Sequence, residues 1–232
     1  MQFPEYPYPQ EESSVNFMYK VYGYMSLALA VTAAVAYFVF QNPVMYAYVK
    51  SSPWLLIGMF FLQLVLVIVL SAAIMKLSFF SAFLLFMVYA VSVGITFSFL
   101  FEVYTESSIY ATFLVTSLMF GATCLYGYFT KADLTSIGSF GFMALIGLII
   151  GGVVNIFLKS TMFDFILSAC GVVVFTLLTA YDAQKIKELG YKLIGSPSTR
   201  KKVAISGALT LYLDFINLFL YLLRFFGRRN ES

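Results

Sequence analysis

The chain has 232 residues, of which 61% are hydrophobic, 19% are aromatic and only 11% are charged. A soluble domain carries about a quarter of its residues as charge, so this chain cannot build a surface that faces water. With a mean hydropathy of +0.90, the composition indicates an integral membrane protein and excludes a disordered chain. A net charge of only +3, without a basic patch, argues against nucleic acid as a partner.

The residue types that the sequence lacks exclude several classes of catalytic and metal site. The sequence has no histidine, which excludes Ser–His and Cys–His catalysis, histidine zinc sites and histidine-ligated haem. The two cysteines, Cys124 and Cys170, lie far apart in apolar stretches and form no CxxC pair. We therefore expect neither an enzyme nor a bound cofactor.

The first twenty residues are polar, and they carry three prolines and three glutamates. They lack the basic start and the short apolar core of a secretory signal. We expect residues 1–20 to form an exposed N-terminal tail. A single membrane domain over residues 21–229 and a short C-terminal tail, 230–232, would complete the chain.

Seven apolar stretches are long enough to cross a bilayer, which takes about 20 helical residues. Their short connections leave no room for a soluble domain, so the expected fold is an all-α integral membrane bundle of seven transmembrane helices. The longest connection is residues 182–203. The predicted spans are Val21–Phe40, Trp54–Met75, Phe79–Phe101, Ile109–Phe129, Ile137–Leu158, Met162–Tyr181 and Ala204–Phe226.

The distribution of lysine and arginine predicts the orientation, because basic residues are enriched in cytoplasmic connections. With seven spans, nine of them fall on the side of the N-terminus, six of these in residues 182–203, and five fall on the other side. This predicts a cytoplasmic N-terminus and a cytoplasmic 182–203 connection. The basic pair Arg228 and Arg229 leaves open a six-span alternative, in which the last segment is re-entrant and both ends are inside.

Two aspartates lie where a membrane helix rarely carries charge. Asp214 is near the middle of the last apolar segment, and Asp182 ends the sixth. A carboxylate at mid-bilayer costs at least about 2.5–3.5 kcal/mol, so it tends to face a cavity or a partner. The alternative for each aspartate is a plain hydrogen bond to a neighbouring helix.

Asp214 belongs to a polar stripe whose members recur every three or four residues, as on one face of a helix. We expect this face to line a pathway or to stand at the centre of the bundle. The stripe comprises Gly207, Thr210, Asp214, Asn217, Tyr221 and Arg224.

Three other features support ordinary structural roles. Gln63, in the second span, is expected to form a hydrogen bond between helices. Glu102 lies near a helix end and is expected to be solvated. Gly147 and Gly151 form a GxxxG pair, which lets helix backbones approach closely.

Specific strings carry a family resemblance. Residues 211–219, LYLDFINLF, followed by Arg224, resemble the C-terminal signature of the Bax inhibitor-1 family, and residues 181–186, YDAQKI, resemble its other signature. Residues 125–131, LYGYFTK, are similar to its bacterial, YccA-like branch. The resemblance runs from about residue 20 to residue 229.

The resemblance implies a seven-helix bundle with the last helix at its centre, located in a bacterial inner membrane. It also implies a pH-sensitive calcium leak channel, in which Asp182 and Asp214 form a hydrogen-bonded pair that senses pH. Two positions depart from relatives: Gln63 stands in place of a glutamate, and no arginine is found near the end of the second span, where Lys76 is the basic residue.

The leading hypothesis is therefore a passive calcium leak through the lipid bilayer. Asp182 and Asp214 would be weak, transient calcium ligands, because calcium prefers oxygen and a conduction site must release its ion. The absence of a GxxxxGK[ST] phosphate loop excludes a primary pump. The alternatives are a non-transporting regulator that binds another membrane protein, such as a quality-control protease, and, less favoured, an intramembrane enzyme.

Overall fold

A computed structural model describes residues 10–193 and 197–230, with side chains from residue 15 onward. These residues are almost entirely helical, and the described part of the chain contains no strand beyond one isolated bridge between Tyr104 and Arg229. The elements are α1 (Gln10–Gln41), α2 (Pro43–Ser51), α3 (Pro53–Ala72), η1 (Ile74–Lys76), α4 (Phe79–Phe97), α5 (Leu100–Val103), α6 (Glu106–Phe129), α7 (Thr135–Leu158), α8 (Thr161–Lys192) and α9 (Pro197–Phe226).

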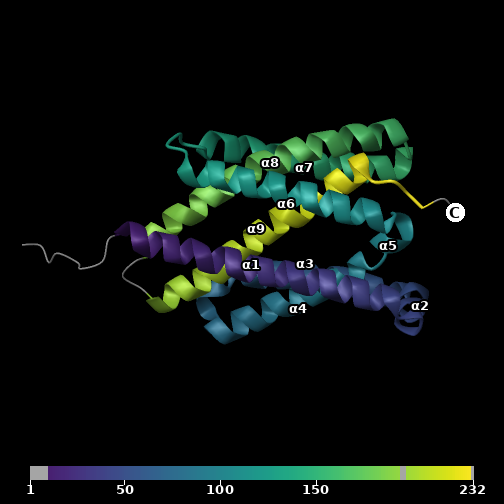
Figure 1. The fold of residues 1–232 in the computed structure, drawn as a ribbon, viewed down its shortest axis with the longest axis horizontal. Helices are drawn as coiled ribbons and strands as arrows, with labels where there is room; N and C mark the ends of the chain where they lie inside the picture. Colours follow the sequence, from purple (N-terminus) through teal and green to yellow (C-terminus); the bar gives the residue numbers. More distant parts are fainter. Residues whose placement is uncertain (1–9, 194–196, 231–232) are drawn as a thin grey trace, which may run out of the picture.

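Seven of these helices, α1, α3, α4, α6, α7, α8 and α9, have the length and apolar composition needed to cross a membrane. The predicted all-α membrane bundle of seven helices is therefore confirmed. Figure 1 shows α9 crossing obliquely between one group formed by α1, α3 and α4 and another formed by α6, α7 and α8. Helix α9 is one continuous helix of 30 residues, and this length favours a full membrane span over a re-entrant segment.

The last helix occupies the centre of the bundle. It packs against α8, α1, α6 and α4, and its most apolar window is 67% buried, compared with 11% for α3 and α7. Tyr212 of α9 is fully buried, and its hydroxyl forms a 2.7 Å hydrogen bond with Thr32 of α1. Thr32 donates in turn to the carbonyl oxygen of Ala90 in α4, at 2.9 Å. These bonds satisfy polar groups inside the core and fix α9 against two neighbours.

The first helix starts earlier than the sequence predicted. It begins at Gln10, so residues 10–20, which we expected in an exposed tail, are helical, and residues 1–9 lie outside the described part. The reason is burial: Phe17 and Met18 are only 2% and 3% exposed. The Phe17 ring packs where Gly190 of α8 leaves space, since a Cβ at Gly190 would lie 2.6 Å from that ring.

The predicted connection over residues 182–203 is also mostly helical. Helix α8 continues to Lys192 and α9 begins at Pro197, so both helices extend beyond their predicted ends. Ala183, Ile186 and Gly190 are buried along the extension of α8. Ile186 packs against Gly207 of α9, where a Cβ would lie 3.1 Å from its side chain. Apolar contact of the extended part of α8 with its neighbours therefore outweighs the high content of basic residues in this segment.

The end of the chain is held against the turn before α6. The Thr105 amide donates to the Arg228 carbonyl oxygen at 3.0 Å, and the Asn230 amide donates to that of Val103 at 2.9 Å. Asn230 also donates through its side chain to the carbonyl oxygen of Glu102, at 2.9 Å. Residue 230, predicted in a C-terminal tail, is thus part of the fold, and residues 231–232 lie outside the described part.

Of the two glycines in the GxxxG pair, only Gly151 serves helix packing. A Cβ at Gly151 would lie 2.7 Å from Leu167 of α8, whereas a Cβ at Gly147 would meet no atom within 4 Å. The expected close approach therefore occurs inside this bundle, between α7 and α8, and involves half of the motif.

Candidate functional site

The two aspartates meet at a cavity on one side of the central helix α9. Its volume is about 620 Å³, and α3, α4, α7, α8 and α9 all contribute to its wall. Thr210, Asp214, Asn217 and Tyr221 line it from α9, while Asp182 lines it from α8. The polar stripe read from the sequence therefore faces a cavity over most of its length. From Thr210 to Tyr221 the helix rises about 16 Å, roughly half of a 30 Å hydrocarbon layer.

Asp214 is the more deeply buried of the two aspartates. Its side chain sits on the central helix and the residue is only 5% exposed. One of its carboxyl oxygens, Oδ2, is fully buried and has no hydrogen-bond partner. An unsatisfied buried oxygen of this kind is destabilising by about 1–3 kcal/mol, so its retention calls for an explanation beyond packing.

Asp182 is half-buried on α8, and its carboxyl group is in hydrogen-bond contact with that of Asp214. Within the described residues, no lysine or arginine forms an ion pair with either carboxyl group. The nearest basic influence on Asp182 is Lys185, one helical turn away, whose ammonium lies 5.4 Å from the ring centroid of Tyr181.

Two carboxyl groups in contact cannot both ionise without strong repulsion, and a poorly solvated site makes that repulsion larger. A single proton placed between them removes the repulsion and supplies the hydrogen that their contact requires. Two carboxyl groups placed in this way can hold one proton between them.

The other polar groups on the wall are largely committed to bonds of their own. Gln63 of α3 donates to the Thr96 hydroxyl of α4 at 3.1 Å, which confirms the predicted bond between helices. Thr210 donates to the Ser206 carbonyl oxygen at 3.2 Å, and Asn217 donates to that of Leu213 at 2.8 Å. The sequence did not place Gln63 beside the aspartates, yet it lines the same cavity.

Arg224 does not belong to the site, although it continues the stripe. It is exposed in the last turn of α9 and is absent from the cavity wall. Its guanidinium lies 5.8 Å from the ring centroid of Tyr221. Tyr221 closes that end of the cavity, because its ring stacks on Phe175 and covers Gly171 of α8.

The site lacks the ligands of a tight metal centre. Over residues 10–193 and 197–230, no three histidine, cysteine, aspartate or glutamate side chains are grouped so that they could hold a metal ion. Two carboxyl groups and the neutral oxygens of the wall would bind a hard cation such as calcium only weakly.

Two residues that sequence reasoning missed fix the helix carrying Asp182. Gln184 donates to the Ala132 carbonyl oxygen at 2.8 Å and accepts from the Leu134 amide at 3.0 Å, so it ties α8 to the connection between α6 and α7. Lys187 donates to the Tyr128 carbonyl oxygen at 2.6 Å. The sequence could have identified Gln184 by its position, because it follows Asp182 by two residues in the string YDAQKI.

A second carboxylate cluster lies at the opposite end of the bundle from the α1 N-terminus. Glu102 accepts a 2.5 Å hydrogen bond from the Lys50 ammonium, with which it forms an ion pair, and another bond from the Tyr46 hydroxyl. Burial, and then the hydrogen bond to Glu102, raise the pKa of Tyr46. Glu102 is exposed, as the sequence predicted, but the sequence did not show that α2 brings two donors to it.

Comparison with known proteins gives the same assignment as the two signature strings. Residues 14–231 match the family described as "Inhibitor of apoptosis-promoting Bax1". The chain is 46% identical over 230 residues to the inner membrane protein YbhL of Escherichia coli (strain K12), covering 96% of this chain and 98% of that protein.

Two further relatives are equally long. An uncharacterized protein of Rickettsia prowazekii (strain Madrid E) is 45% identical over 222 residues, covering 95% of this chain and 93% of the relative. An uncharacterized membrane protein of Streptococcus pyogenes serotype M3 is 32% identical over 226 residues, covering 96% and 97%. The chain is therefore an integral membrane protein that belongs to the Bax inhibitor-1 family.

Proposed function

We propose that the protein is a passive, pH-sensitive cation leak channel, with calcium as the permeating ion and the pair Asp182 and Asp214 as its sensor and gate. The observation that carries the proposal is the contact of two carboxyl groups, without a basic partner among the described residues, on the wall of a cavity at membrane depth. A purely structural pair would be better satisfied, since a buried carboxyl oxygen without a partner is costly.

The chemistry of the wall suits a cation that passes through. Calcium prefers oxygen ligands, and Asp182, Asp214, Thr210 and Asn217 offer only oxygen toward a cation. Such a site is weak, which conduction requires because the ion must leave as easily as it enters. No cofactor or energy source is needed for a leak down a gradient.

The pair can act as a gate because it has two discrete arrangements. With one shared proton, the two carboxyl groups attract each other and hold α8 to α9. With both groups ionised, they repel each other and favour hydration of the cavity. Because the cavity covers about half of the bilayer, an ion path needs a further opening, and separation of α8 from α9 would supply it.

Ion flux across pH tests the proposal. The full chain would be placed in liposomes with an entrapped calcium dye, and flux would be recorded between about pH 6 and 8 for the wild type, Asp182→Asn, Asp214→Asn and the double variant. Asparagine keeps the shape of aspartate but cannot titrate. We expect each single variant to lose most of the pH response, and the double variant to add little, because the pair acts as one unit.

Two results would contradict the proposal. A single asparagine variant with the wild-type pH response would exclude the sensor role. Absence of flux from the wild type at every pH would exclude the channel and leave the non-transporting regulator as the better function.

We further propose that the protein lies in a bacterial inner membrane with a cytoplasmic N-terminus. The nine-to-five distribution of basic residues supports this orientation, and the printed name of the Escherichia coli relative supports the location. A cysteine at Lys192, in a Cys124→Ala, Cys170→Ala background, should be protected from an impermeant thiol reagent in intact cells. Labelling from outside would show the opposite orientation.

A further inference from the structure

Two apolar cavities between α1 and α6 form one continuous groove on the far side of α9 from the aspartates. Their volumes are about 310 and 570 Å³, and they share Leu29, Ala33, Phe113 and Phe215 as wall residues. Phe215, Ile216 and Phe219 line the groove from α9, and at 3.6 residues per turn their centre is about half a turn from the residues of α9 that line the aspartate cavity. The groove and the aspartate cavity therefore use opposite faces of α9. We call it the α1/α6 groove.

Small side chains face each other across this groove. Ser26, Ala30 and Ala33 line it from α1, and Ser117 and Gly121 line it from α6. Facing small residues normally bring two membrane helices into close contact. Here α1 and α6 hardly touch, and Figure 1 shows α9 crossing behind the space between them. A Cβ on Gly121 would meet no atom within 4 Å, so the groove is open space at that point.

The groove opens sideways at membrane depth. Helices α1 and α6 both qualify as membrane spans, and the rim residues Tyr37, Tyr110 and Leu125 are 45%, 55% and 60% exposed. The wall residues are mostly aliphatic or aromatic, so the lining is largely apolar. Water does not stably fill an apolar cavity, whereas lipid chains surround the protein at this depth.

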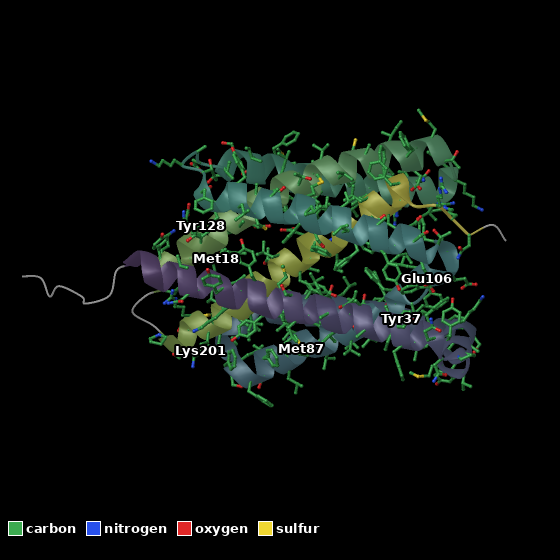
Figure 2. All side chains as sticks on the ribbon, in the orientation of Figure 1. Met18, Tyr37, Met87, Glu106, Tyr128 and Lys201 are labelled. Atoms are coloured by element: carbon green, nitrogen blue, oxygen red, sulfur yellow. The ribbon has the colours of Figure 1, made fainter. Side chains whose placement is uncertain are left out.

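A basic side chain marks one end of the groove. Lys187 of α8 places its ammonium 2.6 Å from the Tyr128 carbonyl oxygen and 4.6 Å from the centroid of the Tyr128 ring. Tyr128 lies one helical turn beyond Cys124, which lines the groove from α6. Figure 2 shows Tyr128 and Met18 at this end of the bundle, and Tyr37 and Glu106 at the other.

The larger cavity has the length of one leaflet. Its wall on α1 runs from Tyr22 to Ala33, which is about 16 Å along the helix, close to half of a hydrocarbon layer of about 30 Å. A cation at one end of an apolar channel of this length matches an anionic phospholipid, which has a phosphate joined to a hydrocarbon chain.

We propose that the α1/α6 groove binds one acyl chain of an anionic phospholipid, drawn from the leaflet at the end of the bundle that holds the α1 N-terminus. The chain lies along the small residues of α1 and α6 and contacts Phe215. The phosphate lies near Lys187. The bound chain fills the space that keeps α1 apart from α6 and supports the central helix on the face opposite the aspartates.

Native mass spectrometry of the full chain in detergent, titrated with phosphatidylglycerol, tests this site. Gly121→Leu and Ala33→Leu each place a side chain in the groove. Gly147→Leu is the matched control, because Gly147 is a helical glycine with equally open surroundings on α7, outside the groove. We expect one tightly retained lipid in the wild type, binding at least tenfold weaker in both groove variants, and binding within twofold of wild type in the control.

Lys187→Gln tests the headgroup contact separately. We expect it to lower the preference for phosphatidylglycerol over phosphatidylcholine at least threefold, and an unchanged preference would overturn the assignment of the phosphate. The site itself would be overturned if the wild type retains no lipid, if only detergent occupies it, or if both groove variants bind phosphatidylglycerol as the wild type does.

Discussion

The carboxylate groups at Glu102 and at Asp214 have opposite surroundings. Glu102, near one end of the bundle, is met by the Lys50 ammonium and the Tyr46 hydroxyl, and the side chains of Glu102 and Lys50 are about half exposed. Asp214, on the central helix, is almost completely buried, leaves one carboxyl oxygen without a hydrogen-bond partner, and has another carboxyl group, that of Asp182, as its contact.

The difference shows which cluster serves the fold. A carboxylate near the membrane surface with a cation and a hydroxyl beside it is electrostatically satisfied in one state, so Glu102 fixes α2 to α5. Two carboxyl groups in contact avoid repulsion when they share a proton, which is the basis of the proposed pH response. The first cluster is suited to anchoring, and the proposed switch is the second.

The largest expected effect comes from breaking the support beside Asp182. Gly127 of α6 lies against α8, and a Cβ there would be 2.2 Å from the carbonyl oxygen of Ala180, two residues before Asp182. Since backbone must move to accept it, Gly127→Ala should lower the unfolding free energy by about 3 kcal/mol or more, or prevent folding. Thermal unfolding in detergent measures this, with Gly121→Ala on the same helix as the control. Equal stability of the two variants would contradict the predicted backbone contact.

Replacing the buried carboxyl by an apolar group should separate stability from switching. Asp214→Leu removes an unsatisfied buried oxygen, so we expect the unfolding free energy to rise by about 1–2 kcal/mol while the pH response of flux is lost. Asp214→Asn, which keeps a polar group in place, should lose the response without that gain. A destabilised Asp214→Leu protein would mean that the carboxyl group contributes to the fold.

Removing the negative charge of Glu102 should lower stability slightly, whereas Asp214→Leu is expected to raise it. Glu102→Gln weakens the ion pair with Lys50, which is half exposed, so the melting temperature at neutral pH should fall only slightly. The pH dependence of flux should match the wild type. A Glu102→Gln protein whose flux no longer responds to pH would show that the two clusters are not separate in function.

The smallest effect is expected at Asp133, in the connection before α7. Its carboxylate accepts hydrogen bonds from the Thr135 side chain and from the Thr135 amide, and these lower its pKa. A lowered folded-state pKa gives stability that is present above the unfolded value of about 4 and is lost as pH falls through the folded value. Asp133→Ala should therefore melt slightly below the wild type at pH 7, and the difference should shrink as pH falls below about 4. A melting difference that stays constant as pH falls below about 4 would contradict this account.

Most of the fold could be predicted from the sequence, because a bilayer requires long apolar helices and few alternatives satisfy the backbone. The errors lie where apolar contact continues beyond the membrane. Phe17 is buried in the extended part of α1, and Ile186 packs against Gly207 from the extended part of α8, although the surrounding residues are polar or basic. Charge and hydropathy predict which part of a helix lies in the bilayer, but they do not predict helix packing beyond the bilayer.

The site was only partly predictable. The spacing of Thr210, Asp214 and Asn217 placed them on one face, and the two signature strings identified both aspartates. The sequence could not show that Arg224 falls outside the cavity or that Gln63 lies on its wall, because both depend on how α3 and the last turn of α9 are placed. The donors to Glu102 were equally hidden, since Tyr46 and Lys50 are more than fifty residues away.

Infrared spectroscopy of the protonated carboxyl group tests the central claim, a proton shared by Asp182 and Asp214, most directly. Spectra of the full chain in lipid would be recorded across pH for the wild type, Asp182→Asn, Asp214→Asn and Glu102→Gln. We predict one protonated-carboxyl band that titrates in the wild type, persists in Glu102→Gln and is lost or strongly shifted in both aspartate variants. A wild type without such a band, or a band unchanged by either aspartate substitution, would contradict the shared proton and the gate built on it.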